Sequence, residues 1–376
     1  MCDSNPSDIM DVEERYALIT RNVQELTTGE ELKALLAKED YQPTAYIGFE
    51  PSGLVHLGWA LVAAKIKDLC DAGIKVIIFW ADWHAYINDK LGGDIENIRI
   101  CAKYFEDCFI ALGVPRDKVE FRYAYELLDG IDYWEKVIKI AKVTSLSRVK
   151  RAMTIMGRSE NDADLDTSKI FYPILQAADI FYLDVDISYA GLDQRRANML
   201  ARDAADKLGW KKPIALHTPL LPGLKGGQRM DPAMLKKEDA DIDTSFKMSK
   251  SDPNASLRIH DTPEDIRRKM KKAFCPQERE DESINPVLMV CKSIIFPKLG
   301  KIEITFPEKF GGGSAVYNSY EELSEAYFSG KLFPSDLKSG AAEGLIKVLE
   351  PVKEYFDEHP ENYEAMQKVL KKLGKL

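Results

Sequence analysis

Cysteine is scarce in this sequence, and no long apolar run is present. The six cysteines are Cys2, Cys70, Cys101, Cys108, Cys275 and Cys291. None belongs to a CxxC pair or has a histidine at zinc-ligand spacing, so we expect free thiols in a reducing cytoplasm and no metal held by side chains. No apolar run reaches the length of a membrane span, and the acidic N-terminal segment is unlike a signal or transit peptide. These absences predict a cytoplasmic protein without membrane contact.

An excess of positive charge is also lacking. The 52 Lys and Arg residues are outnumbered by 61 Asp and Glu, which gives a formal net charge of -9. This balance argues against a protein wrapped in nucleic acid and against DNA as a partner, although a local basic surface stays possible. The 376 residues, 45% hydrophobic and 30% charged, fit a globular protein with room for two domains.

Strands and helices alternate through the first two thirds of the chain. A buried strand is expected at 44–49, a helix at 56–71 and a continuous apolar strand at 75–81. An amphipathic helix at 95–112 and an alternating strand at 119–123 follow. This order predicts an α/β domain with a Rossmann-type, doubly wound parallel sheet.

The remaining segments complete the predicted domain order. Residues 126–158 are typical of helices, and the pattern after residue 262 is helices joined by loops. The expected order is an N-terminal helical lead-in (1–38), the Rossmann-type domain (39–246) with a helical insert (about 108–160), a loop (247–261) and a mainly α-helical C-terminal domain (262–376).

The stretch from Tyr46 to Trp59 is a candidate phosphate site. A strand leads through the turn Pro51-Ser52-Gly53 into a helix that starts near His56. Such a junction places backbone N–H groups and a positive helix end at the carboxyl edge of a sheet. A plain chain turn explains this stretch equally well, so a second signal is needed.

The second signal is the sequence KMSKS, from Lys247 to Ser251, which follows a polar, glycine-bearing stretch at 223–246. With the HLGW sequence from His56 to Trp59, it resembles the two signatures of class I aminoacyl-tRNA synthetases. In this chain Trp59 replaces the second histidine of the first signature, which leaves His56 as the imidazole of that motif.

The resemblance implies that an amino-acid carboxylate attacks the α-phosphate of ATP, with Mg²⁺ sharing the phosphate charge. The reaction needs positioning and charge stabilisation rather than proton transfer by a side chain. The implied catalytic residues are His56, Lys247, Ser249, Lys250 and Ser251. The implied ATP-binding residues are Gly48, Pro51, Gly53, His56, Gly58 and Met248.

Over nearly the whole chain, the resemblance is closest to the archaeal and eukaryotic tyrosyl-tRNA synthetases. It implies that Tyr46 and Asp179 hold the substrate phenol, and that Tyr172, Gln176 and Gln194 hold the α-amino and carboxylate groups. Implied pocket walls are Phe79, Ala81 and His84.

The residues themselves support part of this set. Tyr172, Gln176 and Asp179 are spaced four and three apart, so they share one helix face. An Asp on a largely apolar helix needs a partner if it is buried. Tyr46 or Tyr172 alone would more often be a packing residue, and His84 is as often a packing residue as a ligand contact.

Contacts with tRNA and a homodimer are implied by the resemblance alone. Arg151 matches a residue that contacts the acceptor stem, and Phe310 and Asp336 match residues that read the first anticodon base in an anticodon-binding domain. The insert around 110–150 is the expected dimer interface. The sequence thus predicts a tyrosine–tRNA ligase with tyrosine, ATP and tRNA(Tyr) as partners. The alternatives are a tryptophan–tRNA ligase and a non-catalytic tRNA-binding relative.

Overall fold

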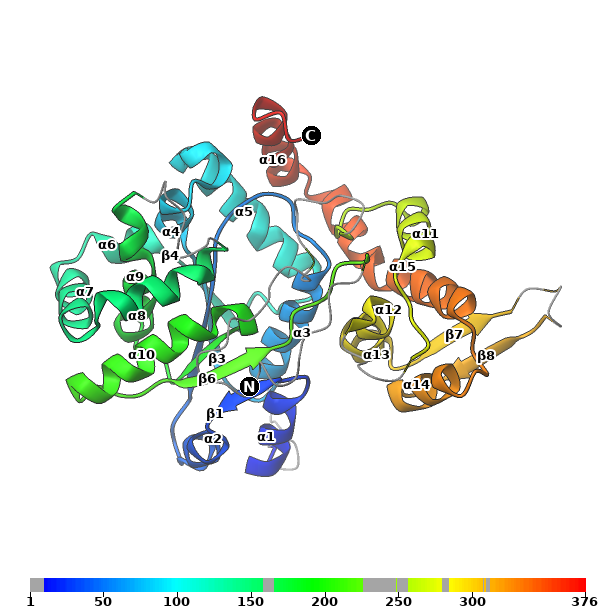
Figure 1. The fold of residues 1–376 in the computed structure, drawn as a ribbon, viewed down its shortest axis with the longest axis horizontal. Helices are drawn as coiled ribbons and strands as arrows, with labels where there is room; N and C mark the ends of the chain where they lie inside the picture. The colour runs from blue at the N-terminus through cyan, green and yellow to red at the C-terminus, as the bar shows by residue number, and fades with distance from the viewer. Residues whose placement is uncertain are drawn as a thin grey trace, which may run out of the picture.

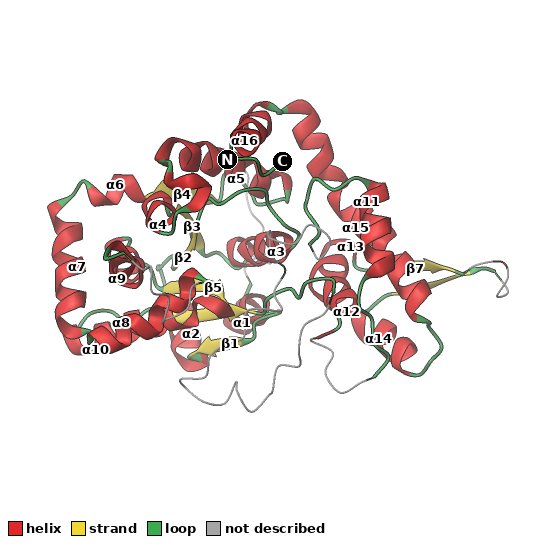
Figure 2. Ribbon diagram, turned by 45° about the horizontal axis from the view of Figure 1, so that its top comes forward, coloured by secondary structure: helices red, strands yellow, loops and turns green. Residues whose placement is uncertain are grey.

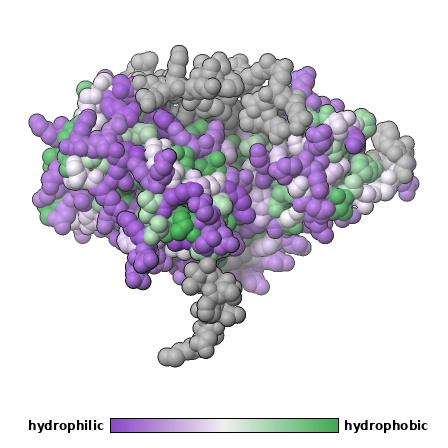
Figure 3. All heavy atoms as spheres, turned by 90° about the horizontal axis from the view of Figure 1, so that it is seen from below, coloured by the Kyte–Doolittle hydropathy of each residue, from purple (hydrophilic) through white to green (hydrophobic). Residues whose placement is uncertain are grey.

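The chain forms an α/β part and a mainly helical part (Figure 1). The structure is a computed structural model that describes residues 10–157, 166–225, 248, 256–278, 284–306, 308 and 312–376. In the described residues no helix is long and apolar enough to cross a membrane. The face seen in Figure 3 is mostly hydrophilic, with hydrophobic atoms in smaller patches.

A six-stranded sheet in the order β1-β6-β5-β2-β3-β4 is the centre of the α/β part. All neighbouring strands are parallel except β1 and β6. The strands are β1 (Glu25–Thr27), β2 (Thr44–Phe49), β3 (Lys75–Trp80), β4 (Val119–Tyr123), β5 (Ile187–Gly191) and β6 (Ile214–Thr218). The predicted doubly wound sheet is confirmed, but β6 was not predicted.

Helices cover both faces of the sheet, which explains the continuous apolar run of β3. Val76, Ile78 and Trp80 pack in the core with helices α3 (Gly58–Asp71) and α5 (Ile95–Ala111). Ile77 and Phe79 point the other way, into a core with α9 (Ser168–Tyr182) and α10 (Arg195–Leu208). Each such side chain contributes about 1.5–3 kcal/mol by leaving water.

The N-terminal lead-in contains a strand as well as helices, which corrects the prediction for 1–38. Between α1 (Val12–Thr20) and α2 (Gly29–Leu36), strand β1 pairs antiparallel with β6, Glu25 opposite His217. A strand of three residues is too short to show a period of two, so local pattern cannot reveal it.

The insert lies between β4 and α9. It consists of α6 (Ala124–Leu128), α7 (Ile131–Val143), α8 (Leu146–Ala152) and the 3-10 helix η3 (Met153–Met156). The predicted start near 108 is too early, because 108–111 end α5 and 119–123 form β4. Helix α7 packs against α9 on one side and forms the outer edge of the α/β part (Figure 2).

The C-terminal part is mainly helical, as predicted, but includes an unpredicted hairpin. Its elements are α11 (Pro263–Lys272), α12 (Pro286–Val290), the π-helix η7 (Cys291–Ile295), α13 (Phe296–Leu299), β7 (Ile302–Thr305), β8 (Ser314–Tyr317), α14 (Tyr320–Phe328), α15 (Pro334–Glu358) and α16 (Glu361–Lys372). Gly340 lets α15 approach β7, since a Cβ there would lie 2.6 Å from Ile304 Cγ1. Helix α16 returns to pack on α5.

Candidate active site

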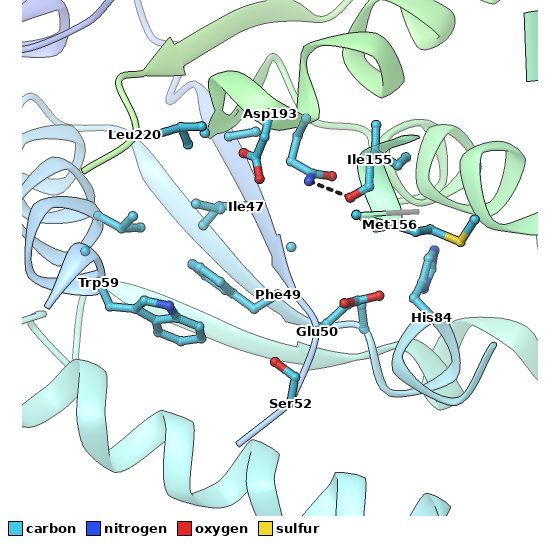
Figure 4. A pocket seen from close by; sticks show the side chains of 18 of the residues that line it. Ile47, Phe49, Glu50, Ser52, Trp59, His84, Ile155, Met156, Asp193 and Leu220 are labelled. Atoms are coloured by element: carbon cyan, nitrogen blue, oxygen red, sulfur yellow. Dashed lines mark hydrogen bonds between the residues drawn. The ribbon is translucent and has the colours of Figure 1, made fainter. Parts of the chain in front are cut away.

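A cavity of about 730 Å³ opens at the carboxyl ends of β2 and β5. These two adjacent strands are where the chain reverses its winding direction, the usual ligand site of such sheets. Figure 4 shows Phe49 and Glu50 rising from the end of β2 and Asp193 reaching in from the segment after β5. The cavity has an amino-acid end near α9 and a nucleotide end near the start of α3.

The amino-acid end is built around Asp179, which is fully buried on α9. The hydroxyl of Tyr133 donates to Asp179 Oδ1 at 2.7 Å. Oδ2 accepts no hydrogen bond from the described residues, and His84 Nε2 lies 3.4 Å from it. Tyr46, Ala81 and His84 line the cavity with Asp179. The structure therefore brings the two predicted phenol partners, Tyr46 and Asp179, into one cavity.

Burial sets the protonation of this end. It raises the pKa of Asp179 well above the usual value, and the Tyr133 hydrogen bond opposes that rise. Burial lowers the pKa of His84 to about 3, so its imidazole is neutral near pH 7. The pKa of Tyr46 is raised by burial and by the charge of Asp179, so its phenol stays protonated.

Gly48 serves the amino-acid end through its missing side chain. It lies two residues after Tyr46 on β2, on the same face, and a Cβ at Gly48 would collide with the Tyr46 hydroxyl. Phe79 is fully buried beneath Tyr46, with ring centroids 5.6 Å apart. Phe79 is not among the described residues that line the cavity, so it supports Tyr46 rather than forming the predicted wall.

A carboxylate missed by the sequence reasoning lies at the middle of the cavity. Glu50 Oε1 accepts from the Tyr172 hydroxyl at 2.8 Å and from Asn88 Nδ2 at 2.9 Å. Lys90 Nζ lies 3.5 Å from Glu50 Oε2. Glu50 could have been predicted as a site residue, because it is a charged residue at the end of a buried strand.

The two predicted glutamines lie beside this carboxylate in the cavity lining. Gln176 Nε2 donates to Gln194 Oε1 at 3.4 Å, and Gln194 Nε2 donates to the carbonyl oxygen of Ile155 at 3.1 Å (Figure 4). Gln176 Oε1 is buried and accepts no hydrogen bond from the described residues. Tyr172, Gln176 and Gln194 are thus brought together as predicted, with Glu50 added.

The nucleotide end is formed by the turn before α3. His56 and Gly58 line it, and the Gly58 N–H donates to His56 Nδ1 at 3.1 Å. A Cβ at Gly58 would lie 2.8 Å from the His56 ring, so glycine keeps the imidazole in place. Helix α3 begins at Gly58, two residues later than predicted.

The turn itself faces α5 as much as the cavity. Gly53 has φ of 130°, and its N–H donates to Cys101 Sγ at 3.4 Å. Among the described residues, Ser52 lines the cavity whereas Pro51 and Gly53, two of the predicted ATP-binding residues, do not. Pro51 and Gly53 shape the turn.

Met248, a residue of the second signature, lies next to the nucleotide end. It is buried, lines the cavity, and its N–H donates to the Leu221 carbonyl at 2.7 Å. The predicted catalytic residues Lys247, Ser249, Lys250 and Ser251 lie outside the described residues.

Trp59 fills the position where the family signature has its second histidine. It is buried among three phenylalanines, with ring centroids 4.7 Å from Phe49, 4.4 Å from Phe105 and 5.3 Å from Phe109. Trp59 also lines the cavity. A bulky indole therefore packs the floor of the nucleotide end, where an imidazole would leave this cluster underfilled.

Two of the predicted tRNA residues, Arg151 and Asp336, lie in different parts of the fold. Arg151 is half-buried near the end of α8, in the insert. Asp336 is in the first turn of α15, next to Phe333, which is 60% exposed. Phe310 lies outside the described residues.

Comparisons with known proteins agree with this geometry. The family "tRNA synthetases class I (W and Y)" matches residues 38–231 and 240–350. The chain is 45% identical to a tyrosine–tRNA ligase of Saccharolobus islandicus over 96% of this chain and 99% of the relative. It is 48% identical to a tyrosine–tRNA ligase of Sulfolobus acidocaldarius over 92% of this chain and 94% of the relative.

Solved structures give the same result. The tyrosyl-tRNA synthetase of Pyrococcus horikoshii, complexed with L-tyrosine, matches with a TM-score of 0.85 and 44% identity, over 96% of this chain and 100% of that chain. A tryptophanyl-tRNA synthetase of Aeropyrum pernix K1 matches with a TM-score of 0.63 at 20% identity over 91% of this chain and 84% of that chain, which shows a shared fold alone.

The chain belongs to the class I tRNA synthetases of the tryptophan and tyrosine family. Within that family, the relatives that match it at 45% and 48% identity are tyrosine–tRNA ligases.

Proposed function

We propose that this enzyme is a tyrosine–tRNA ligase, which joins tyrosine to ATP and then passes it to the 3′ end of tRNA(Tyr). The observation that carries the proposal is Asp179, buried at the closed end of the cavity with Oδ2 free to accept a hydrogen bond. A phenol satisfies such a group, whereas a substrate without the hydroxyl leaves it buried and unpaired. Discrimination of this kind reaches about 10⁴–10⁵, and the synthetase for tyrosine is the general example of it.

Tyrosine lies in the cavity with its ring toward Asp179 and its amino acid head toward Glu50. The substrate hydroxyl donates to Asp179 and accepts from Tyr46, which uses both of its hydrogen-bonding roles. The ammonium group lies among the acceptors of Glu50, Tyr172 and Gln176, where the negative charge of Glu50 stabilises it.

ATP binds at the nucleotide end and is attacked by the tyrosine carboxylate. A carboxylate oxygen forms a bond to the α-phosphorus, the bond from that phosphorus to the bridging oxygen breaks, and pyrophosphate leaves with the electron pair. No proton moves in this step, so positioning and charge stabilisation suffice. His56 donates to phosphate oxygens, and Lys247 and Lys250, with Ser249 and Ser251, neutralise and hold the pyrophosphate.

Mg²⁺ accompanies ATP as part of the substrate. Among the described residues no group of three or more His, Cys, Asp or Glu side chains could hold a metal ion. Mg²⁺ usually combines phosphate oxygens with one or two carboxylates, and Glu50 and Asp193 line this cavity. Bound to phosphate oxygens, Mg²⁺ supplies positive charge as pyrophosphate leaves.

In the second step, a hydroxyl of the terminal tRNA ribose attacks the tyrosyl carbonyl and releases AMP. Arg151 contacts the acceptor stem, and Phe310 and Asp336 read the first anticodon base. This assignment is supported by the placement of Arg151 on α8 and Asp336 on α15, in two separate parts of the fold, since a tRNA spans from its acceptor end to its anticodon.

The enzyme acts as a homodimer through the outer face of α7. Ile131 is 75% exposed and Ile138 is 66% exposed on this face, together with Trp134. Such a cluster is typical of an interface that a second copy covers. Ile138→Glu yields monomers in analytical ultracentrifugation, whereas Lys139→Glu, at an exposed polar position turned about 100° from Ile138 around the same helix, leaves the dimer intact.

The cytoplasm is the proposed compartment. The five cysteines in the described part of the chain are free thiols, and four of them are buried. Reduced cysteines fit a compartment in which glutathione and thioredoxin keep thiols unpaired.

Amino-acid-dependent exchange of pyrophosphate into ATP tests the proposed function. We expect exchange with tyrosine and none above background with tryptophan or phenylalanine. Exchange with tryptophan alone would assign the other specificity of the family. Binding of tRNA without exchange for any amino acid would indicate a non-catalytic relative.

A further inference from the structure

We propose that Tyr133, on the insert helix α7, is a positioning residue that fixes the carboxylate of Asp179 for selection of tyrosine over phenylalanine. This inference rests on the proposed function and adds a specificity-determining residue outside the cavity. Tyr133 is fully buried and is not among the described residues that line the cavity. It therefore acts on the substrate through Asp179 and not by contact.

The ring of Tyr133 is held on several sides. It packs edge-on against Trp134, with centroids 6.0 Å apart, and against Tyr182, with centroids 5.5 Å apart. Its oxygen lies 2.7 Å from Asp179 Oδ1 and 3.4 Å from the carbonyl oxygen of Leu175. A phenol has one proton to donate, and the shorter, charge-assisted contact is the one to Asp179.

This hydrogen bond leaves Oδ2 as the oxygen for the substrate. A carboxylate is planar, so anchoring Oδ1 also fixes the direction of Oδ2. Oδ2 is buried, accepts no hydrogen bond from the described residues, and Asp179 lines the cavity. A carboxylate free to rotate would share its two oxygens between Tyr133 and the ligand, and the geometry of recognition would be lost.

The charges around Asp179 make this anchor necessary. The titratable groups near the carboxylate are Tyr133 on α7, Tyr46 on β2, Tyr172 on α9, and His84 and Asp82 on α4 (Asp82–Ile87). None supplies a positive charge near pH 7: the pKa of His84 is about 3, and Asp82 adds negative charge. The Tyr133 hydroxyl is therefore the described hydrogen-bond donor that opposes the rise in the pKa of Asp179.

Loss of the Tyr133 hydroxyl changes what Asp179 can do. The pKa of Asp179 rises further, because the donor that stabilises the ionised form is gone. A protonated carboxyl can donate as well as accept, so it no longer requires a donating phenol. Selection against phenylalanine weakens, and tyrosine affinity improves as pH rises through the raised pKa.

The test compares Tyr133→Phe with Tyr182→Phe in pyrophosphate exchange. Tyr133→Phe keeps the ring and removes the anchor. Tyr182→Phe removes a hydroxyl from the ring that packs on Tyr133, and no hydrogen bond joins Tyr182 to Asp179. Melting temperatures of both variants, expected within about 5 °C of the wild type, establish that they fold.

For Tyr133→Phe we expect kcat/KM for tyrosine to fall about tenfold, mainly through KM, as for loss of one charge-assisted hydrogen bond. We expect kcat/KM for phenylalanine to be unchanged. KM for tyrosine in this variant rises more steeply than in the wild type as pH falls from 8.5 to 6. Tyr182→Phe keeps the wild-type selectivity and pH profile.

Two results would overturn the inference. One is wild-type selectivity and pH profile in Tyr133→Phe. The other is an equal loss for tyrosine and phenylalanine, which would make Tyr133 a packing residue only. Absence of tyrosine-dependent exchange in the wild type would instead refute the proposed function. The wild type is therefore measured before any variant.

Discussion

The two ends of the cavity are formed by different kinds of structural element. The amino-acid end consists of buried side chains on regular elements: Asp179 on α9, Tyr46 on β2 and Tyr133 behind them on α7. The nucleotide end consists of a turn, a helix start and Met248. In the proposed function, specificity therefore depends on fixed, buried side chains, whereas phosphate binding depends on a helix start and on residues far apart in the sequence.

The largest expected effect is at the amino-acid end. Asp179→Ala removes the carboxylate that accepts the substrate phenol, and kcat/KM for tyrosine falls on the order of 10³-fold or more. KM for ATP stays within about threefold if the ends are separate. Exchange kinetics measure both values, and circular dichroism establishes that the fold is intact. Near-normal tyrosine activation would contradict the assignment of the pocket.

A smaller effect, on catalysis and not on tyrosine binding, is expected at the nucleotide end. His56→Ala removes a donor to phosphate oxygens, so kcat for exchange falls about 10²-fold. The dissociation constant for tyrosine, measured by calorimetry without ATP, stays the same. A large loss of tyrosine affinity would mean that the two ends are not independent.

Glu50 lies between the ends and gives a finer test. Glu50→Gln removes the charge that faces the substrate ammonium, so KM for tyrosine rises about tenfold. Inhibition by 3-(4-hydroxyphenyl)propionate, which lacks the amino group, is the matched control and stays unchanged. Equal weakening of both ligands would show that Glu50 holds the pocket structure and not the ammonium.

The smallest effect concerns stability at the amino-acid end. The pKa of His84 falls from 6.5 to about 3 in the folded protein because of burial. Between these two pKa values, the unfolded chain binds a proton at His84 and the folded chain does not. The free energy of unfolding therefore decreases as pH falls below 6.5. Between pH 7 and pH 5, the free energy of unfolding of His84→Gln is expected to fall by about 1–2 kcal/mol less than that of the wild type. Urea unfolding at each pH measures this difference. An identical loss in both proteins would contradict a neutral buried His84.

Periodicity and signatures predicted much of the site because several of its residues repeat within one element. Tyr172, Gln176 and Asp179 follow helical spacing on α9, and all three line the cavity. The doubly wound sheet was predictable from the alternation of strands and helices along the chain. The tyrosine assignment came from resemblance, which the comparisons support.

Contacts between distant segments were not predictable from local pattern. Tyr133 and Asp179 are 46 residues apart, and Tyr133 alone reads as an ordinary aromatic on a helix. Strand β1 is three residues long and is defined by its pairing with β6. Pro51, Gly53 and Phe79 were assigned to the ligand by resemblance. In the structure Pro51 and Gly53 shape the turn and Phe79 packs against Tyr46, and none of the three is among the described residues that line the cavity.

Trp59 can also serve as an intrinsic fluorescent probe of the site. Indole emission depends on the polarity and packing around the ring, and among the described residues that line the cavity Trp59 is the tryptophan. It belongs to the floor of the nucleotide end, in contact with Phe49, Phe105 and Phe109. Its fluorescence should therefore respond to ATP and much less to tyrosine, so that a single titration can follow the occupancy of one end while the other is filled.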